Sequence, residues 1–253
     1  MSIKSFVFSL LPLSTQRRII LQKTGQKVIS NAALTPTITL DVVIPPKGNT
    51  WVNRLAKPYG HEPEVVKWFE RNLKNDDVVF DVGAHFGFYG ILATQLCPQV
   101  KFYGFEGNWF TISFQESNRL KSPQPNNWFP INKMVGDHAN KDFVMVDQYI
   151  KDGIVPTVFQ MDVDGEEVNV FNGAKSLIDL AKTTFIIEVH PKDLKERGQN
   201  IDQVLNFFSD EKFKKAYLPN LRKLDTQWTA ELSAEERTEE FYFLATPIDQ
   251  PRM

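Results

Sequence analysis

Two glycines enclose a short turn that directly follows a buried apolar run. After the run Val78–Val82 the chain continues Gly83, Ala84, His85, Phe86, Gly87. Glycine permits positive φ angles and lets the backbone approach a ligand closely. The spacing is not the Gly-x-Gly-x-x-Gly of a dinucleotide site, because His85 stands where the second glycine is needed. The turn therefore favours another kind of ligand.

Two carboxylates near this turn favour a cationic ligand. Asp81 stands where a pyrophosphate would meet repulsion, and Glu106 ends the next apolar run, 23 residues beyond Gly83. A carboxylate at that place can accept hydrogen bonds from two ribose hydroxyls, as it also does in NAD sites. S-adenosylmethionine carries a sulfonium and an amino group, so negative charge favours it over diphosphate cofactors. We predict an S-adenosylmethionine site; alternatively, Asp81 caps the following helix and Glu106 is a solvated strand end.

The predicted cofactor contacts come from this turn and from three neighbouring points. They are Glu62, Asp81, Gly83, Ala84, His85, Gly87, Phe88, Glu106, Asn108 and Asp137. Glu62 precedes a predicted helix, where it either closes over the methionyl end of the cofactor or caps that helix. Asp137 follows a predicted strand and is expected beside the adenine ring, with a turn role as the alternative.

Four titratable side chains follow two later apolar runs. Asp162 and Asp164 follow one run, and Glu188 and His190 end the next. Adjacent parallel strands bring such ends into one crevice. A neutral imidazole, with an ordinary pKa near ~6.5, can take the proton of an acceptor hydroxyl. We predict His190 as the base and Asp162 and Glu188 as its catalytic partners. Asp162, Asp164 and Glu188 also offer oxygen ligands for Mg²⁺, so a divalent metal is an open alternative.

These residues must be positioned by an alternation of short apolar runs and helical patterns, which is typical of a parallel sheet with crossover helices. The predicted strands are 37–44, 78–82, 100–105, 131–135, 143–146, 157–161, 185–189, 217–218 and 241–244, and the predicted helices are 63–73, 88–96, 110–120, 166–180 and 201–208. The polar segment before the last strand predicts a closing hairpin. We expect an α/β, Rossmann-like fold with a mostly parallel seven-stranded sheet, helices on both faces and an antiparallel last strand.

Length and composition indicate one globular domain. We expect residues 1–60 to form an extension packed on a core domain of residues 61–253. The net charge of −2 supplies no basic stripe, so a DNA or RNA acceptor is disfavoured. The single cysteine, Cys97, fits a cytoplasmic protein without internal disulfides. The apolar run 6–13 is too short to span a bilayer, and we favour a packed or interfacial helix there over membrane-surface contact or a signal.

Three segments carry a resemblance to a known family. They are Val78-Val-Phe-Asp-Val-Gly-Ala-His-Phe-Gly-Phe-Tyr89, Phe159-Gln-Met-Asp-Val-Asp-Gly-Glu-Glu167 with Asn172-Gly-Ala174, and Phe185-Ile-Ile-Glu-Val-His190. The first is similar to the first motif of class I methyltransferases, and the three together resemble the FkbM family. The resemblance implies an S-adenosylmethionine-dependent methyltransferase that acts on a hydroxyl of a small molecule, saccharide or lipid-linked acceptor.

The chain departs from the family pattern at three positions. Gln160 stands in place of a common lysine, Asp164 in place of glutamate, and Gly107 where proline often follows the ribose-binding acid. These departures keep two alternatives open. One is a non-catalytic module that binds the cofactor, and the other is an N- or C-methyltransferase on the same scaffold.

Overall fold

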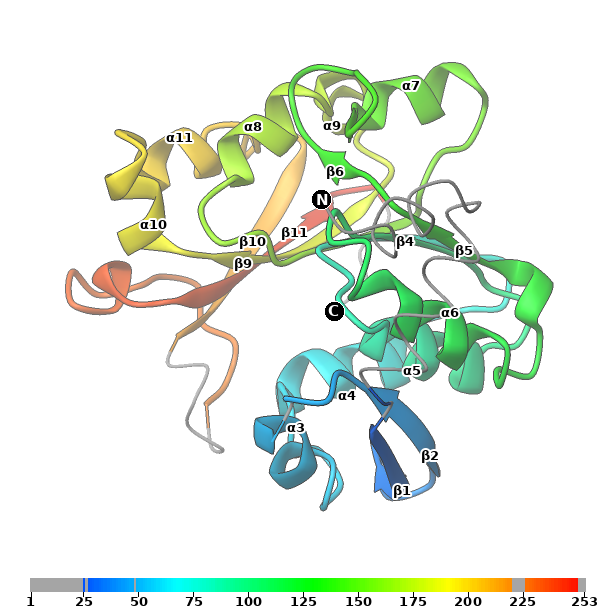
Figure 1. The fold of residues 1–253 in the computed structure, drawn as a ribbon. Helices are drawn as coiled ribbons and strands as arrows, with labels where there is room; N and C mark the ends of the chain where they lie inside the picture. Colours follow the sequence, from blue (N-terminus) through cyan, green and yellow to red (C-terminus); the bar gives the residue numbers. More distant parts are fainter. Residues whose placement is uncertain (1–24, 26, 48, 220–225, 250–253) are drawn as a thin grey trace, which may run out of the picture.

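The computed structural model describes residues 25, 27–47, 49–219 and 226–249 of the chain. Its centre is a seven-stranded sheet with the order β10-β11-β9-β8-β3-β4-β5. Helices cover both faces of this sheet (Figure 1). The predicted Rossmann-like class is therefore confirmed, including the seven strands and the antiparallel last strand.

The chain alternates between strands and helices over most of its length. In order, the elements are β1 (Lys27–Ala33), β2 (Thr39–Ile44), α3 (Asn49–Arg54), α4 (Pro63–Asn72), β3 (Val78–Val82), α5 (Phe88–Leu96), β4 (Lys101–Phe105), α6 (Ile112–Arg119), the 3-10 turn η1 (Pro125–Asn127), β5 (Trp128–Ile131), β6 (Met134–Val135), β7 (Phe143–Val144), α7 (Val146–Lys151), β8 (Val158–Met161), α8 (Glu167–Asn172), α9 (Lys175–Leu180), β9 (Thr184–Val189), α10 (Pro191–Glu196), α11 (Ile201–Leu205), β10 (Phe213–Pro219), η2 (Glu236–Thr238) and β11 (Phe241–Pro247).

Strand β3 lies at the middle of the sheet, and the chain order reverses there. β3 pairs in parallel with β4 on one side and with β8 on the other, and β9 continues the parallel part beyond β8. β11 runs antiparallel between β9 and β10, so the chain closes in the predicted hairpin. In open α/β sheets, ligands bind beyond the carboxyl ends of the strands at such a reversal.

The two faces of the sheet carry separate apolar cores. Successive strand residues face opposite sides, so Val79 joins the core with α4, α5 and the β1–β2 hairpin, whereas Phe80 joins the core with α8 to α11. In Figure 1, α4, α5 and α6 lie below the sheet, and α7, α8, α9, α10 and α11 lie above it. Both cores are rich in aromatic rings, which leaves the sheet rigid beneath the site.

The segment before α4 packs on the first core. The predicted strand 37–44 is part of a hairpin, whose first strand, β1, the sequence analysis missed. Asn118 of α6 accepts a hydrogen bond from the Val43 amide at 2.8 Å and donates one to the Val43 carbonyl at 2.8 Å. This pair of bonds joins the hairpin to the core. The division at residue 60 stays a prediction, and the apolar run 6–13 lies outside the described residues.

Several predicted elements were wrong in position or extent. The third strand is Trp128–Ile131 and not 131–135; Met134 and Val135 instead pair with β7 in a separate small sheet. The predicted helix 166–180 is two short helices, broken where Gly173 packs against the carbonyl of Gly136. The expected strand 143–146 ends at Val144 because α7 begins at Val146. The sequence analysis also missed α10.

Among the helices of the described residues, none is both long and apolar enough to cross a membrane.

Candidate active site

A cavity of about 720 Å³ opens beyond the carboxyl ends of β3, β4, β8 and β9. Its lining is strongly acidic. The carboxyl side chains around it are Glu62, Asp81, Glu106, Asp162, Asp164, Glu166, Glu188 and Glu240, whereas Arg54 and Lys133 are the permanent cations among its described lining residues. Excess negative charge in a cleft raises the local concentration of cations. The cavity therefore favours a cationic ligand.

The glycine turn between β3 and α5 forms one wall of this cavity. Gly83 and Gly87 have φ angles of +87° and +86°. A β-carbon at Gly83 would collide with the carbonyl oxygen of Asp162, and one at Gly87 would collide with the ring of Trp128. The predicted cofactor residues Ala84, His85 and Phe88 also line the cavity. At both positions only glycine tolerates the positive φ angle and the close contact. The fold alone therefore requires the two glycines, whatever the ligand is.

Glu106 connects the glycine turn with the loop after β4. Its Oε2 accepts the amide hydrogen of His85 at 3.0 Å, and its Oε1 accepts that of Asn108 at 2.7 Å. Burial raises the pKa of Glu106, and these two bonds oppose the shift. The side chain of Asn108 accepts the amide of Phe110 at 2.9 Å and so shapes the start of α6. Glu106 thus lies in the cavity with its carboxylate held in place, as a ribose-binding acid must.

Two buried oxygen acceptors lie side by side beneath the turn. Asp81 and Gln160 are register partners on β3 and β8, and they are 1% and 2% exposed. Oδ2 of Asp81 and Oε1 of Gln160 have no hydrogen-bond partner among the described residues. Burial, followed by the charges of Asp162, Glu62 and Glu106, raises the pKa of Asp81 well above its usual range. Both acceptors line the cavity, so a ligand with N–H donors and positive charge would satisfy them.

Glu62 is the N-cap residue of α4, but its side chain lines the cavity. It has a φ of 41° and forms no side-chain cap bond to that helix. Its Oε2 instead accepts hydrogen bonds from the hydroxyls of Tyr89 and Tyr242, the latter at 2.6 Å, while its Oε1 lies 3.1 Å from Nε2 of His61. The Tyr242 oxygen is also 3.0 Å from Oε2 of Glu188. Tyr242 thus links Glu62 to the catalytic end of the cavity.

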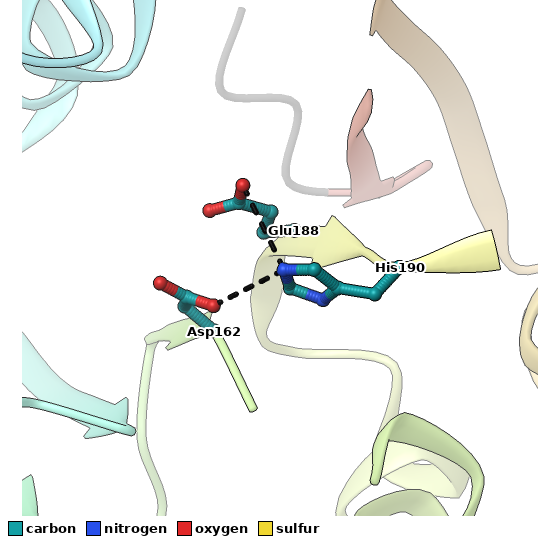
Figure 2. A group of neighbouring side chains, drawn as sticks. All are labelled: Asp162, Glu188 and His190. Carbon is teal, nitrogen blue, oxygen red and sulfur yellow. Dashed lines mark ion pairs between the residues drawn. The ribbon is translucent and has the colours of Figure 1, made fainter. Parts of the chain in front are cut away.

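Asp162, Glu188 and His190 meet at the ends of β8 and β9 (Figure 2). The register pairs Met161 with Ile187, so the next residues on the two strands are neighbours. Nε2 of His190 lies 3.5 Å from Oδ1 of Asp162 and 3.8 Å from Oε1 of Glu188. The predicted convergence is therefore present in the structure. Asp164 comes within 3.7 Å of the same nitrogen, but its side chain is 88% exposed.

A fourth acidic residue, Glu167, contacts the imidazole ring of His190 at its Nδ1 atom. Its side chain is fully buried, and its Oε1 lies 2.9 Å from Nδ1 of His190 and accepts the His190 amide hydrogen at 3.0 Å. The sequence analysis missed Glu167 and Tyr242. Glu167 is the last residue of the segment Phe159–Glu167, which resembles the family pattern. The sequence therefore contained a signal for this residue. Tyr242 could be found only with the pairing of β11 and β9, which sets it opposite Glu188.

The charges of this group shift its proton affinities. Burial lowers the pKa of His190, but the hydrogen bond with Glu167 and the charges of Glu188 and Asp162 outweigh it and raise that pKa to about 9. Burial and the charge of Glu62 raise the pKa of Asp162 to about 7. Burial and the charges of Glu62 and Asp162 raise the pKa of Glu188 to about 9. Without a ligand, the His190 ring is therefore protonated at neutral pH.

Asp137 does not lie in the cavity, contrary to the sequence-based expectation. It is exposed, and its Oδ1 lies 2.8 Å from Nδ1 of His138. This hydrogen bond lowers the pKa of Asp137. The cavity wall beyond β5 comes instead from Lys133, Met134 and Val135. The error follows from the misplaced third strand, whose true end at Ile131 moves the adenine-side wall to residues before Asp137.

The fold is that of the Rossmann-like methyltransferases, and the acidic cavity with its glycine turn suits a cationic cofactor. A family model described as the methyltransferase FkbM domain matches residues 113–215. The match confirms the resemblance to the FkbM family that the later motifs indicate. It includes the segments around Asp162 and His190 and begins after the glycine turn. No curated protein matches the sequence.

Solved structures similar to this chain include further methyltransferases. A putative rRNA methylase from Clostridium thermocellum has 10% identity and a TM-score of 0.50, over 74% of this chain and 96% of that one, and this likeness shows the fold alone. Methyltransferase FkbM from Methylobacillus flagellatus KT has 14% identity and a TM-score of 0.49 over 68% of this chain. The chain spans 44% of the length of that protein. An S-adenosylmethionine-dependent O-methyltransferase from Thermotoga maritima has 11% identity and a TM-score of 0.47, over 90% and 80% of the two chains.

Proposed function

We propose that the protein transfers the methyl group of S-adenosylmethionine to a hydroxyl oxygen of a small molecule, a saccharide or a lipid-linked acceptor. One observation carries this proposal: Asp162, Glu188 and His190 converge at the carboxyl ends of β8 and β9, in the same cavity that the glycine turn lines. A methyl donor at the turn would face a polar group that can bind a hydroxyl and promote loss of its proton. Such positioning accounts for much of the catalysis of a group transfer.

In this proposal the cofactor lies along the carboxyl ends of β3 and β4. Glu106 accepts hydrogen bonds from the ribose hydroxyls, and its contacts with the amides of His85 and Asn108 keep it oriented. The unsatisfied oxygens of Asp81 and Gln160 accept hydrogen bonds from the ammonium group. Each acceptor then gains a donor that it lacks among the described residues, and the cationic cofactor offsets part of the charge of the cavity.

The reaction is an in-line displacement at carbon. An oxygen lone pair of the acceptor forms the new C–O bond as the C–S⁺ bond breaks, and the sulfur keeps that electron pair and becomes a neutral thioether. The hydroxyl proton must leave, because the product ether is neutral. His190 was expected to take it, but a pKa of about 9 leaves its ring protonated at neutral pH in the unliganded protein. We therefore assign the removal of the proton to the three-residue group as a unit.

The acceptor half of the cavity is built largely by the N-terminal segment. Trp51 of α3, Arg54 and His61 line it, together with Glu240 near the start of β11. The Trp51 ring lies in edge-to-face contact with Phe86, at a centroid distance of 4.6 Å. An aromatic face beside polar groups suits the apolar face and hydroxyl edge of a sugar ring or a comparable small molecule. The expectation against a nucleic acid acceptor stays a prediction.

The test is a methyl-transfer assay with radiolabelled S-adenosylmethionine on panels of saccharides, lipid-linked saccharides and hydroxylated small molecules. The expected product carries a methyl ether, identified by mass and by resistance to mild acid and base. Asp162→Asn should lower turnover by about 100-fold or more while cofactor affinity changes little. An N-methyl or C-methyl product, or tight cofactor binding without transfer to any acceptor, would contradict the proposal.

A further inference from the structure

The facing atoms of Asp162, Glu188 and His190, drawn in Figure 2, are too far apart for normal hydrogen bonds. His190 Nε2 lies 3.5 Å and 3.8 Å from its nearest oxygens on Asp162 and Glu188. A hydrogen bond between a nitrogen and an oxygen is normally about 2.7–3.2 Å long. The three side chains offer one ligand atom each, and these atoms all lie within 4.8 Å of one another. The three atoms are therefore close enough for one cation to contact all of them.

These separations match the edges of a metal coordination shell. A metal with bonds of about 2.1 Å holds adjacent ligand atoms about 3.0 Å apart in octahedral geometry and about 3.4 Å apart in tetrahedral geometry. The distances from His190 Nε2, 3.5 Å to Asp162 and 3.8 Å to Glu188, exceed the tetrahedral edge by about 0.1–0.4 Å and the octahedral edge by about 0.5–0.8 Å. Small side-chain rotations would close the shell, because Asp162 is half exposed and free to turn.

The surroundings of His190 suit a metal ligand. The His190 side chain is 5% exposed, and its Nε2 forms no hydrogen bond with the described residues, whereas Nδ1 lies 2.9 Å from the buried carboxylate of Glu167. Metal-binding histidines almost always donate the other ring N–H to a carboxylate or carbonyl in this manner. The contact fixes the ring and directs Nε2 into the cavity, where a metal ion would bind this nitrogen in place of its proton. Glu167 thus gives a second observation that points to a cation, independent of the acidic cluster.

The charges around Asp162 and Glu188 also favour a bound cation. Among the described residues, no lysine or arginine forms an ion pair with Asp162 or Glu188. In the proposed function, the sulfonium and ammonium groups of the cofactor would lie at the glycine turn, near Asp81. Among the described residues, His190 is therefore the cationic partner of these two carboxylates, and a metal ion that displaces its proton would take over that role. Buried or half-buried charges are normally paired or coordinate metals.

We propose that Asp162, Glu188 and His190 bind a divalent first-row transition-metal ion that holds the acceptor hydroxyl. The mixed nitrogen and oxygen donor set favours such an ion over Ca²⁺ and Mg²⁺, which prefer oxygen ligands alone. This set differs from the all-carboxylate Mg²⁺ site that the sequence left open as an alternative, because it includes His190. Asp164, with its largely exposed side chain, lies outside the three-residue set.

The role of the ion rests on the proposed function, whereas its binding does not. A metal-bound hydroxyl is far more acidic than a free one, so its proton can pass to solvent at neutral pH. An ion at this site would hold the acceptor oxygen and lower the pKa of its hydroxyl, and it would supply this chemistry while the C–O bond forms and the C–S⁺ bond breaks. On this account Nε2 of His190 is a ligand, and no side chain has to be a separate base.

The direct test is binding of Mn²⁺ to the full-length protein after treatment with EDTA and dialysis, followed by calorimetry and by electron paramagnetic resonance. We expect one Mn²⁺ per chain. Asp162→Asn, Glu188→Gln and His190→Ala should each weaken binding at least 10-fold, and Glu167→Gln about 10- to 100-fold. Glu239→Gln is the matched control, because it removes an exposed carboxylate paired with Lys192 and should leave affinity unchanged.

Each outcome separates the two proposals. Absence of Mn²⁺ binding by the folded wild-type protein would overturn the metal site, as would equal affinity in the wild type and the Asp162 and Glu188 variants. Full methyl transfer by EDTA-treated protein would also overturn the metal's role and leave O-methylation intact. Site-specific Mn²⁺ binding with N- or C-methyl products would support the metal site and refute O-methylation. Circular dichroism of each variant confirms that losses are not due to unfolding.

Discussion

The Nδ1 atom of His190 lies 2.9 Å from Oε1 of Glu167, and both side chains are buried. The same carboxylate oxygen accepts the backbone amide hydrogen of His190. Two contacts from one oxygen therefore fix both the ring and the chain that carries it. The consequence is that Nε2 points toward Asp162 and Glu188 and into the cavity.

This contact gives the first prediction. Glu167→Gln should lower methyl transfer by about 10- to 100-fold, because an amide holds the imidazole less strongly than a carboxylate. The affinity for S-adenosylmethionine should stay within about 3-fold of the wild type, since Glu167 does not line the cavity. Release of S-adenosylhomocysteine on the responding acceptor measures the first quantity, and calorimetry the second. Equal loss of cofactor binding would show that Glu167 is merely structural.

The second prediction concerns the glycine turn. Gly83→Ala should destabilise the protein more than Gly153→Ala, although both glycines have positive φ angles of +87° and +80°. The left-handed backbone costs about 1–2 kcal/mol in each variant. Only at Gly83 does the new methyl group collide with a backbone carbonyl, that of Asp162, which adds about 1–3 kcal/mol. Urea unfolding measures the difference, and equal losses would contradict the packing described for the turn.

The third prediction is that the Asp81 carboxylate lowers the stability of the folded protein but strengthens cofactor binding. Because burial raises its pKa, the folded protein binds this proton more tightly than the unfolded chain, and stability falls as pH rises above about 4. Asp81→Asn removes that penalty. The variant should be more stable than the wild type by about 1–3 kcal/mol at pH 8, and the gain should shrink toward pH 4. It should nevertheless bind S-adenosylmethionine more weakly.

Thermal unfolding of both proteins between pH 5 and pH 8, without ligand, checks the Asp81 prediction. A destabilisation by Asp81→Asn that does not vary with pH would show that the carboxylate has a satisfied structural partner.

Local sequence patterns were enough to predict the central strand of the sheet and the helix that follows it. Val78–Val82 and Phe88–Leu96 were predicted with the bounds that the structure has, because a buried central strand and its following helix are strongly patterned. The edge strand β5 was displaced, since Pro130 and the half-exposed Ile131 weaken its pattern. A proline is tolerated in an edge strand, where one face of the backbone needs no partner.

The site was predictable where it follows strand ends and unpredictable where it depends on cross-strand packing. Asp162, Glu188 and His190 converge as expected because parallel strands align their carboxyl ends. Tyr242 comes from the antiparallel strand β11, and its contact with Glu188 depends on a register that the sequence does not display. The raised pKa of His190 depends on Glu167 as well, so its protonation could not be inferred from an ordinary imidazole.

The most direct measurement is calorimetric titration of S-adenosylmethionine into the wild type, Glu106→Ala and Asp137→Asn. Glu106 lies in the cavity and Asp137 outside it, so the pair separates the site from general effects of lost charge. The account predicts micromolar binding by the wild type, a loss of about 100-fold or more in Glu106→Ala from two hydrogen bonds to a charged group, and no change in Asp137→Asn. No binding by the folded wild type, or equal losses in the two variants, would contradict it.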